Sequence, residues 1–238
     1  MAQQLRVAAA ADLNYALRDI AGKFESETGK KTELTFGSSG NFFTAIENGA
    51  PYDVFLSADM DYAETLQAIG LTVPGTLYEY AVGKIVVWVP TDSKIDVWRG
   101  LSVLTDPSIK KIAIANPRHA PYGRAAVAAL KSAGLYDAVS GKLVLGENIA
   151  QTAQFVQTGN ADIGIIALSL AMAPPTSHSG RYWTIPTSTY PPIRQGAVVL
   201  KVASDQALAR QFLEFFKSPY ARQVFERYGF SSPQASTK

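Results

Sequence analysis

Cysteine is absent from the 238 residues, and histidine occurs only twice, as His119 and His178. The missing cysteines exclude disulfide bridges, thiolate zinc sites and cysteine nucleophiles. Two histidines far apart in the sequence do not favour a metal site built on several imidazoles, and they leave most Ser-His-Asp triads without a base. The sequence therefore predicts neither a catalytic residue nor a bound metal cation.

An excess of one charge is also missing, since 22 lysines and arginines balance 20 aspartates and glutamates to a net charge of +2. This balance provides no basic field for nucleic acid and no polybasic membrane anchor. No run approaches the roughly 18 consecutive apolar residues of a membrane-spanning helix. The first residues, MAQQLRVAAAADL, lack the charged and apolar regions of a signal peptide, so none is expected in this chain.

Apolar segments of strand length alternate with helical patterns along nearly the whole chain. The expected strands are residues 5–9, 32–36, 54–57, 84–89, 112–115, 142–145, 163–167, 181–185 and 196–202. Because 47% of the residues are hydrophobic, there is enough apolar material for a sizeable core. The alternation predicts an α/β fold with largely parallel sheets.

The clearest helical pattern follows the first strand, where an apolar stripe at helical spacing runs from Leu13 to Phe24. Asp12 is expected as the N-cap of this helix and Gly29 as its stop. The other expected helices cover residues 41–48, 59–69, 120–134, 149–158 and, in two pieces broken at Ser218-Pro219, 205–228.

Several expected strands end in small or polar residues directly before a helix begins. These turns are AAAADL at 8–13, FGSSGN at 36–41, NPRHAPYG at 116–123 and GENIAQ at 146–151. Each helix start presents about four backbone N–H groups without an internal acceptor, together with the positive end of the helix dipole. Several such starts meeting at one point bind an anion without lysine or arginine, at the carboxyl ends of the strands. Ordinary connections in α/β proteins look similar, so the pattern alone leaves both interpretations open.

The turn at residues 37–40 places two serines between two glycines. A serine here can donate both its backbone N–H and its hydroxyl to an oxyanion. In the alternative interpretation the turn is ordinary, and Ser39 or Asn41 caps the next helix. The spacing and the lysine of a phosphate loop are missing, and so is a G-x-S-x-G nucleophile elbow.

Six segments together resemble the periplasmic molybdate-binding proteins, which are the substrate-binding components of ABC importers. The segments are AAAADL, GSSG with its helix, ENGAPYDVFLSAD at 47–59, NPRHAPYGRAA at 116–126, GENIAQTAQFVQTGNADIGIIALS at 146–169 and YPPIRQGAVVL at 190–200. The resemblance covers essentially the whole chain in order. It implies a two-lobed periplasmic-binding-protein fold of type II, with mostly parallel sheets flanked by helices and one tetrahedral oxyanion in the interlobe cleft.

Two turn-rich places mark boundaries between the lobes, one around residues 81–84 and one in the segment TSTYPPIR at 187–194. We therefore expect a discontinuous lobe 1 of residues 1–83 plus 191–238, and a lobe 2 of residues 84–190.

The resemblance also implies which residues bind the oxyanion. Ser39 matches the binding serine of the family, and Tyr122 and Ile149 match positions that bind through backbone N–H groups at helix starts. Asp12, with Ala11 beside it, stands where the family usually has serine or asparagine. A carboxylate facing a dianion would repel it, so we expect the Asp12 side chain to cap the first helix and leave its backbone N–H to the ion.

A tyrosine that donates its hydroxyl in some members of the family aligns with Ala167, which removes one donor from the implied site.

The resemblance implies a receptor for molybdate and tungstate that acts in the periplasm as a monomer and delivers its ligand to an ABC-importer membrane permease. It needs no cofactor, and molybdenum is held only as its oxyanion. Sulfate carries the same charge and shape but is smaller, so cavity size would exclude it. Three alternatives stay open. The first is a receptor for sulfate or for phosphate, and in the phosphate case Asp12 would accept a proton of the ligand. The others are an enzyme on the same scaffold, which the scarcity of histidine and cysteine disfavours, and the sensing half of a transcription regulator, although no helix-turn-helix segment is found.

Overall fold

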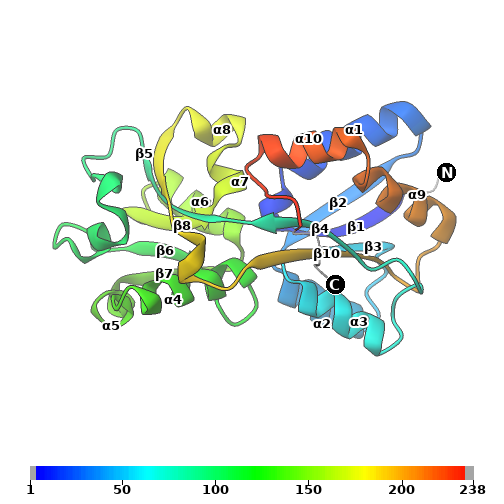
Figure 1. Ribbon diagram of the computed structural model, residues 1–238, viewed down its shortest axis with the longest axis horizontal. Helices are drawn as coiled ribbons and strands as arrows, with labels where there is room; N and C mark the ends of the chain where they lie inside the picture. The colour runs from blue at the N-terminus through cyan, green and yellow to red at the C-terminus, as the bar shows by residue number, and fades with distance from the viewer. Residues whose placement is uncertain (1–3, 234–238) are drawn as a thin grey trace. The chain divides into compact units, whose positions relative to one another are not determined.

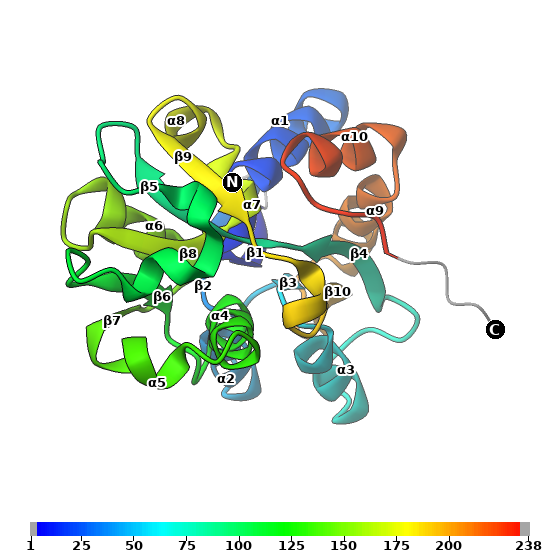
Figure 2. The same cartoon turned by 60° about the vertical axis from the view of Figure 1, so that its left-hand side comes forward.

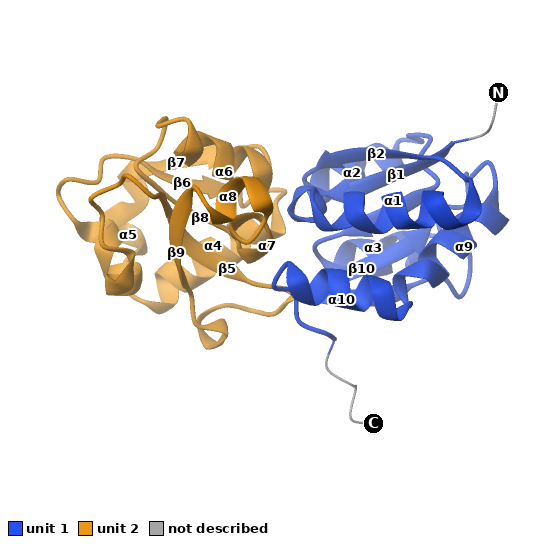
Figure 3. Cartoon of the chain, turned by 90° about the horizontal axis from the view of Figure 1, so that it is seen from above, with its two compact units in different colours: residues 1–82, 194–238 blue, residues 83–193 orange. Residues whose placement is uncertain are grey.

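The computed structural model describes residues 4–233, and the chain divides into two compact units. Unit 1 comprises residues 1–82 and 194–238, and unit 2 comprises residues 83–193 (Figure 3). Each unit contains one five-stranded sheet with helices on both of its faces (Figure 1). None of the helices within residues 4–233 has the length and apolar character needed to cross a lipid bilayer.

The sheet of unit 1 has the strand order β2-β1-β3-β10-β4. Its strands are β1 (Leu5–Ala10), β2 (Thr32–Gly37), β3 (Val54–Ser57), β4 (Tyr78–Gly83) and β10 (Ile193–Val199). Strand β1 pairs in parallel with β2 and β3, whereas β10 runs antiparallel to β3. Because β1 and β2 are parallel and their last residues, Ala10 and Gly37, are paired, the turns that follow the two strands begin next to each other.

Helices cover both faces of this sheet, with α1, α9 and α10 on one face and α2 and α3 on the other (Figure 1). Their bounds are α1 (Ala16–Thr28), α2 (Ser39–Glu47), α3 (Met60–Ala68), α9 (Gln206–Phe216) and α10 (Pro219–Arg227). The apolar stripe predicted for the first helix packs inward, and the Phe24 ring meets the Phe212 ring edge to face with centroids 5.1 Å apart.

The first helix begins later than predicted. Residues Ala11–Leu13 form a short 3₁₀ turn, η1, and α1 starts at Ala16. Neither element has a side-chain cap at its N-terminus, so the prediction that Asp12 caps this helix is wrong. The Asp12 carboxylate instead accepts a hydrogen bond from a side chain of β10, as described below. The predicted stop is confirmed, because Gly29 ends α1 with a φ of 69°, a conformation that favours glycine.

The sheet of unit 2 has the strand order β7-β6-β8-β5-β9. Its strands are β5 (Ile85–Pro90), β6 (Ile112–Ala115), β7 (Leu143–Gly146), β8 (Ile163–Ala167) and β9 (Gly180–Thr184). Strand β6 pairs in parallel with β7 and β8, and β5 runs antiparallel to β8 and β9 (Figure 2). Ala115 pairs with Gly146, so the turns after β6 and β7 are neighbours at one edge, as in unit 1.

The helical segments of unit 2 are α4 (Pro121–Ser132), α5 (Tyr136–Val139), α6 (Ile149–Gln157), α7 (Leu168–Ala171), α8 (Pro174–Ser177) and the 3₁₀ segments η2 (Val97–Thr105), η3 (Ser140–Lys142) and η4 (Thr187–Thr189). Strands β6 and β8 are buried along their whole length, which is expected for central strands with helices on both faces.

Candidate anion-binding site

Three of the predicted site residues lie together at the carboxyl ends of β1 and β2 in unit 1. Ala11 and Asp12 follow β1 directly, and Ser39 is the first residue of α2, which follows β2. The pairing of Ala10 with Gly37 makes these two turns neighbours. All three residues are buried, with exposed fractions of 2%, 1% and 1%.

Ser39 is the first residue of α2. The N-cap position belongs to Ser38, so the alternative in which Ser39 or Asn41 caps the helix is wrong. The Ser39 hydroxyl oxygen accepts a hydrogen bond from the Ala58 N–H at 2.9 Å. A hydroxyl that accepts one bond keeps its own proton to donate. Ser39 can therefore present an O–H from a fixed position and an N–H from the first turn of a helix, where N–H groups have no intrahelical acceptor.

The Asp12 carboxylate is held by a side chain from a distant part of the sequence. Its Oδ2 accepts a hydrogen bond of 2.7 Å from Nε2 of Gln195, a residue of β10 that lies 183 positions away. Oε1 of Gln195 in turn accepts a bond of 2.8 Å from the hydroxyl of Tyr80 in β4. The carboxylate is thus engaged by a charge-assisted bond from a buried amide, and neither η1 nor α1 has a side-chain cap.

Sequence reasoning missed Tyr80 and Gln195. Both are buried, with exposed fractions of 4% and 0%. Burial, and to a smaller extent the charge of Asp12, raises the pKa of the Tyr80 phenol well above its usual value, so this hydroxyl stays a donor. The one available signal was a glutamine inside the apolar run IRQGAVVL, because a polar residue within a buried strand needs a hydrogen-bond partner.

The other two predicted residues lie at the carboxyl ends of β6 and β7 in unit 2. Tyr122 is the second residue of α4, and its N–H is the first of that helix because Pro121 has none. Ile149 is the first residue of α6. Both side chains are buried, and their backbone N–H groups lie in the first turn of a helix, where such groups have no intrahelical acceptor.

The side chain that caps α6 bonds the N–H groups of the second and third residues of the helix, and not that of Ile149. Oδ1 of Asn148 accepts the N–H groups of Ala150 and Gln151, both at 3.0 Å. The Ile149 N–H is not among the groups that this cap satisfies. The positive end of the α6 dipole therefore has one N–H, that of Ile149, that its capping side chain does not bind.

Two glycines allow these helix starts to pack directly on the strand ends. A Cβ atom on Gly123 would lie 2.7 Å from the carbonyl carbon of Ala115 and 2.9 Å from the nitrogen of Pro117. A Cβ atom on Gly146 would lie 2.8 Å from the backbone nitrogen of Thr152. Backbone therefore touches backbone at both places, and only glycine fits.

Ala167 ends β8 and offers no hydroxyl, as predicted from its alignment with the tyrosine of the family. The side chain of Tyr190 lies close to the adjacent strand β5, where its hydroxyl accepts a hydrogen bond of 3.3 Å from the Ile85 N–H. Ile85 is the residue paired with Ala167 across the two strands. Burial raises the pKa of Tyr190, which keeps the proton of this hydroxyl in place.

His119 lies beside the site without belonging to a metal centre. Its Nε2 is 3.5 Å from Oε1 of Glu147, so the pair joins the turn before α4 to the turn before α6. Within residues 4–233, no group of three or more histidine, aspartate or glutamate side chains is arranged to hold a metal ion.

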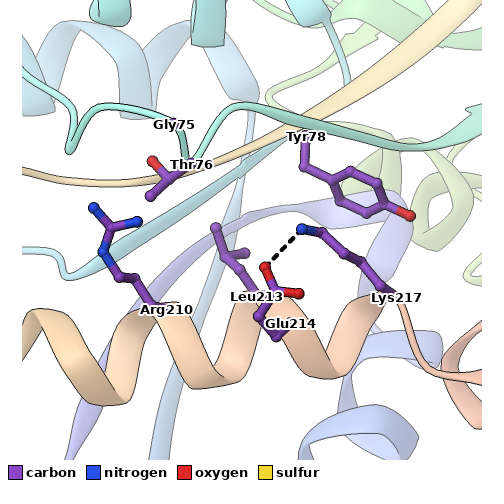
Figure 4. Close-up of a pocket in the computed structure, with 7 residues that line it drawn as sticks. All are labelled: Gly75, Thr76, Tyr78, Arg210, Leu213, Glu214 and Lys217. Atoms are coloured by element: carbon purple, nitrogen blue, oxygen red, sulfur yellow. Dashed lines mark hydrogen bonds and ion pairs between the residues drawn. The ribbon is translucent and has the colours of Figure 1, made fainter.

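A separate hollow of about 150 Å³ in unit 1 lies against α9 (Figure 4). It is lined by Gly75, Thr76, Tyr78, Arg210, Leu213, Glu214 and Lys217. The ammonium group of Lys217 is 2.6 Å from a carboxylate oxygen of Glu214 and 5.2 Å from the centre of the Tyr78 ring. Its lysine is thus paired with a carboxylate, while Nη2 of its arginine, Arg210, donates to the Pro74 carbonyl oxygen at 3.2 Å.

Comparison with known proteins gives consistent results over the whole chain. The sequence profile of the bacterial extracellular solute-binding proteins matches residues 5–231. The molybdate-binding protein ModA of Azotobacter vinelandii is 42% identical over 229 residues, which are 96% of this chain and 90% of that protein. ModA of Rhodobacter capsulatus is 37% identical over 229 residues, which are 96% of this chain and 88% of that protein.

A solved structure is similar to this chain over the same extent. The periplasmic molybdate-binding protein of Azotobacter vinelandii superimposes with a TM-score of 0.91 at 34% sequence identity. The match covers 97% of this chain and 100% of that one. It agrees with the predicted two-lobed fold of type II.

Proposed function

Because the chain belongs to the bacterial extracellular solute-binding proteins, and among them to the molybdate-binding proteins, we propose that it binds molybdate and delivers it to the membrane permease of an ABC importer. The observation that carries this proposal is the pair of helix starts at neighbouring strand ends in each unit, with the Ser39 hydroxyl fixed beside one of them. Such groups suit a tetrahedral dianion better than a cation or an apolar ligand.

The ion is bound by donors that carry no full charge. The N–H groups of Ala11, Asp12, Tyr122 and Ile149 and the hydroxyl of Ser39 donate hydrogen bonds to its oxygens. These bonds replace the water that the ion loses on burial, and each is strengthened by the charge of its acceptor. A single chain binds the ion in the periplasm and releases it again, without a covalent step and without a cofactor.

Selectivity follows from size, since molybdate, tungstate and sulfate share charge and shape. Tungstate, which is close to molybdate in size, is bound as well, whereas sulfate is too small to reach all of the donors at once. A hydrogen bond that is lengthened much beyond 3.2 Å loses most of its strength, so a smaller ion is bound more weakly.

Molybdate and tungstate are expected to raise the melting temperature, because a ligand that binds only the folded state stabilises it by about 2.7 kcal/mol at about a hundredfold excess over Kd. Sulfate and phosphate at the same concentrations are expected to have little effect. Differential scanning calorimetry with the four sodium salts at matched ionic strength provides the measurement. Equal shifts from all four anions contradict selection by size, and no shift from molybdate contradicts the proposed function.

The substitution Asp12→Asn is expected to leave molybdate affinity unchanged or to increase it by up to about fivefold, because removing a negative charge about 10 Å from a dianion is worth about 1 kcal/mol. The new amide keeps an oxygen that can accept the Gln195 Nε2–H. Titration calorimetry on both proteins at two pH values, one on each side of neutrality, measures the effect.

The phosphate alternative makes the opposite prediction for the same variant. If Asp12 accepts a proton carried by the ligand, then Asp12→Asn loses at least about tenfold in affinity, the equivalent of one lost charge-assisted hydrogen bond. Binding to the unmodified protein then strengthens as the pH falls. That result would replace molybdate by a protonated oxyanion as the ligand.

A further inference from the structure

A single buried hydroxyl connects the two side chains of unit 1 that lie at the proposed site. Tyr80 in β4 is 4% exposed, and its ring packs against the rings of Phe216 and Phe225 with centroids 5.8 Å and 5.5 Å away. Its hydroxyl lies 2.8 Å from Oε1 of Gln195 and 3.2 Å from the carbonyl oxygen of Ser57. The phenol has one proton and two acceptors for it, and the shorter bond goes to Gln195.

The first connection runs through Gln195 to Asp12. A glutamine amide can present either its oxygen or its NH₂ group to a neighbour. Because the Tyr80 hydroxyl donates to Oε1, the NH₂ group faces Asp12 and donates to Oδ2 at 2.7 Å. With the amide reversed, an oxygen would face the carboxylate and repel it.

The second connection runs through one peptide group to Ser39. The carbonyl oxygen of Ser57 and the N–H of Ala58 belong to the same planar peptide unit. The Tyr80 proton is shared in a three-centre hydrogen bond, whose longer arm reaches this carbonyl oxygen at 3.2 Å, and the N–H donates to the hydroxyl oxygen of Ser39 at 2.9 Å. A peptide that is bonded on both sides is held in place, and the Ser39 hydroxyl is held with it.

We propose that Tyr80 is a positioning residue of the anion site, which acts on Asp12 through Gln195 and on Ser39 through the Ser57–Ala58 peptide. Tyr80 does not touch the ion. It keeps the Asp12 carboxylate bound to an amide, where its charge is compensated by a donor, and it keeps the Ser39 hydroxyl oriented as a donor. This inference rests on the proposed function, since it assigns Tyr80 a role at the same site.

The test compares two tyrosines of unit 1 that each make a buried or half-buried side-chain hydrogen bond. Tyr80→Phe keeps the ring and removes the hydroxyl. The matched control is Tyr228→Phe, because the Tyr228 hydroxyl donates to Oδ2 of Asp19 in α1 at 2.9 Å, and Asp19 is not one of the proposed site residues. We expect Tyr80→Phe to weaken molybdate binding by about five- to tenfold and Tyr228→Phe to leave it unchanged, while both lower the melting temperature of the free protein.

A double-mutant cycle separates positioning from general loss of structure. In the Asp12→Asn background the side chain at position 12 can pair with either orientation of the Gln195 amide, so the orientation that Tyr80 imposes no longer matters. The loss caused by Tyr80→Phe is therefore expected to shrink to about twofold, the part transmitted through Ser39.

The outcomes distinguish this inference from the function on which it rests. If the unmodified protein fails to bind molybdate in the same titration, the result contradicts the proposed function and, with it, the role of Tyr80. If it binds, and Tyr80→Phe behaves like Tyr228→Phe, only the role of Tyr80 is overturned. An equal loss from Tyr80→Phe in both backgrounds also overturns it, because a merely structural effect does not depend on the charge at position 12.

Discussion

The substitution Ser39→Ala is expected to weaken molybdate binding by about ten- to a hundredfold, because a hydrogen bond to a charged oxygen in a buried site contributes about 1.5–3 kcal/mol. The fold should persist with a lower melting temperature, since the buried Ala58 N–H loses the hydroxyl oxygen that accepts it at 2.9 Å. Titration calorimetry gives the affinity, and thermal unfolding of the free protein gives the stability.

A second serine provides the control for Ser39→Ala. The Ser218 hydroxyl also accepts a backbone N–H, that of Ala221 at 3.1 Å, where it caps α10. Ser218→Ala should therefore lower stability by about 1 kcal/mol without changing molybdate affinity. If the molybdate affinity of Ser39→Ala is within about twofold of that of the unmodified protein, the Ser39 hydroxyl does not contribute the assumed hydrogen-bond energy. Ser39 is then an ordinary turn residue.

The substitution Gly123→Ala is expected to destabilise the protein by about 3 kcal/mol, because the added methyl group collides with the backbone of residues 115 and 117 and cannot be accommodated by a rotamer change. The distances of 2.7 Å and 2.9 Å from the new Cβ to the Ala115 carbonyl carbon and the Pro117 nitrogen leave no room for it. Relief of the collision moves the start of α4 away from β6. The Tyr122 N–H moves with it, so molybdate affinity should fall too.

Gly141→Ala is the matched control for this effect, since a Cβ at that position has no atom within 4 Å. Urea unfolding measures both variants, and the midpoint should fall only for Gly123→Ala. Equal midpoints for the two variants would show that the strand end and the helix start are not in the close contact described above.

Most of the fold was predictable because each element follows from neighbouring residues. Strands β3, β6 and β8 have the predicted bounds, since short apolar runs bounded by turn residues define a buried strand locally. Strand β4 was missed because Tyr78–Gly83 mixes polar and apolar residues without clear alternation. The sheets proved to be mixed, because β10 runs antiparallel to β3, and β5 to β8 and β9. The direction of a strand is set by the long-range path of the chain.

The strand-to-helix turns of the proposed site were predictable, because each depends on neighbouring residues. Ser39, Tyr122 and Ile149 were singled out within these turns by the family resemblance, and the structure places all three at or near the first residue of a helix. The surroundings of Asp12 were not predictable, because its partner Gln195 lies 183 positions away and becomes a neighbour only when β10 enters the sheet. A local rule, which favours aspartate as a cap, was overridden by a tertiary hydrogen bond.

The central claim is that helix starts and one hydroxyl hold the oxyanion, and diffraction from crystals grown with molybdate tests it most directly. Data collected at the molybdenum absorption edge locate the ion independently of any assumed site. We predict one anomalous peak per chain, with ion oxygens about 2.7–3.2 Å from the Ser39 hydroxyl and from the backbone nitrogens of Ala11, Asp12, Tyr122 and Ile149. A peak surrounded by lysine and arginine side chains, or one away from these helix starts, would contradict the account.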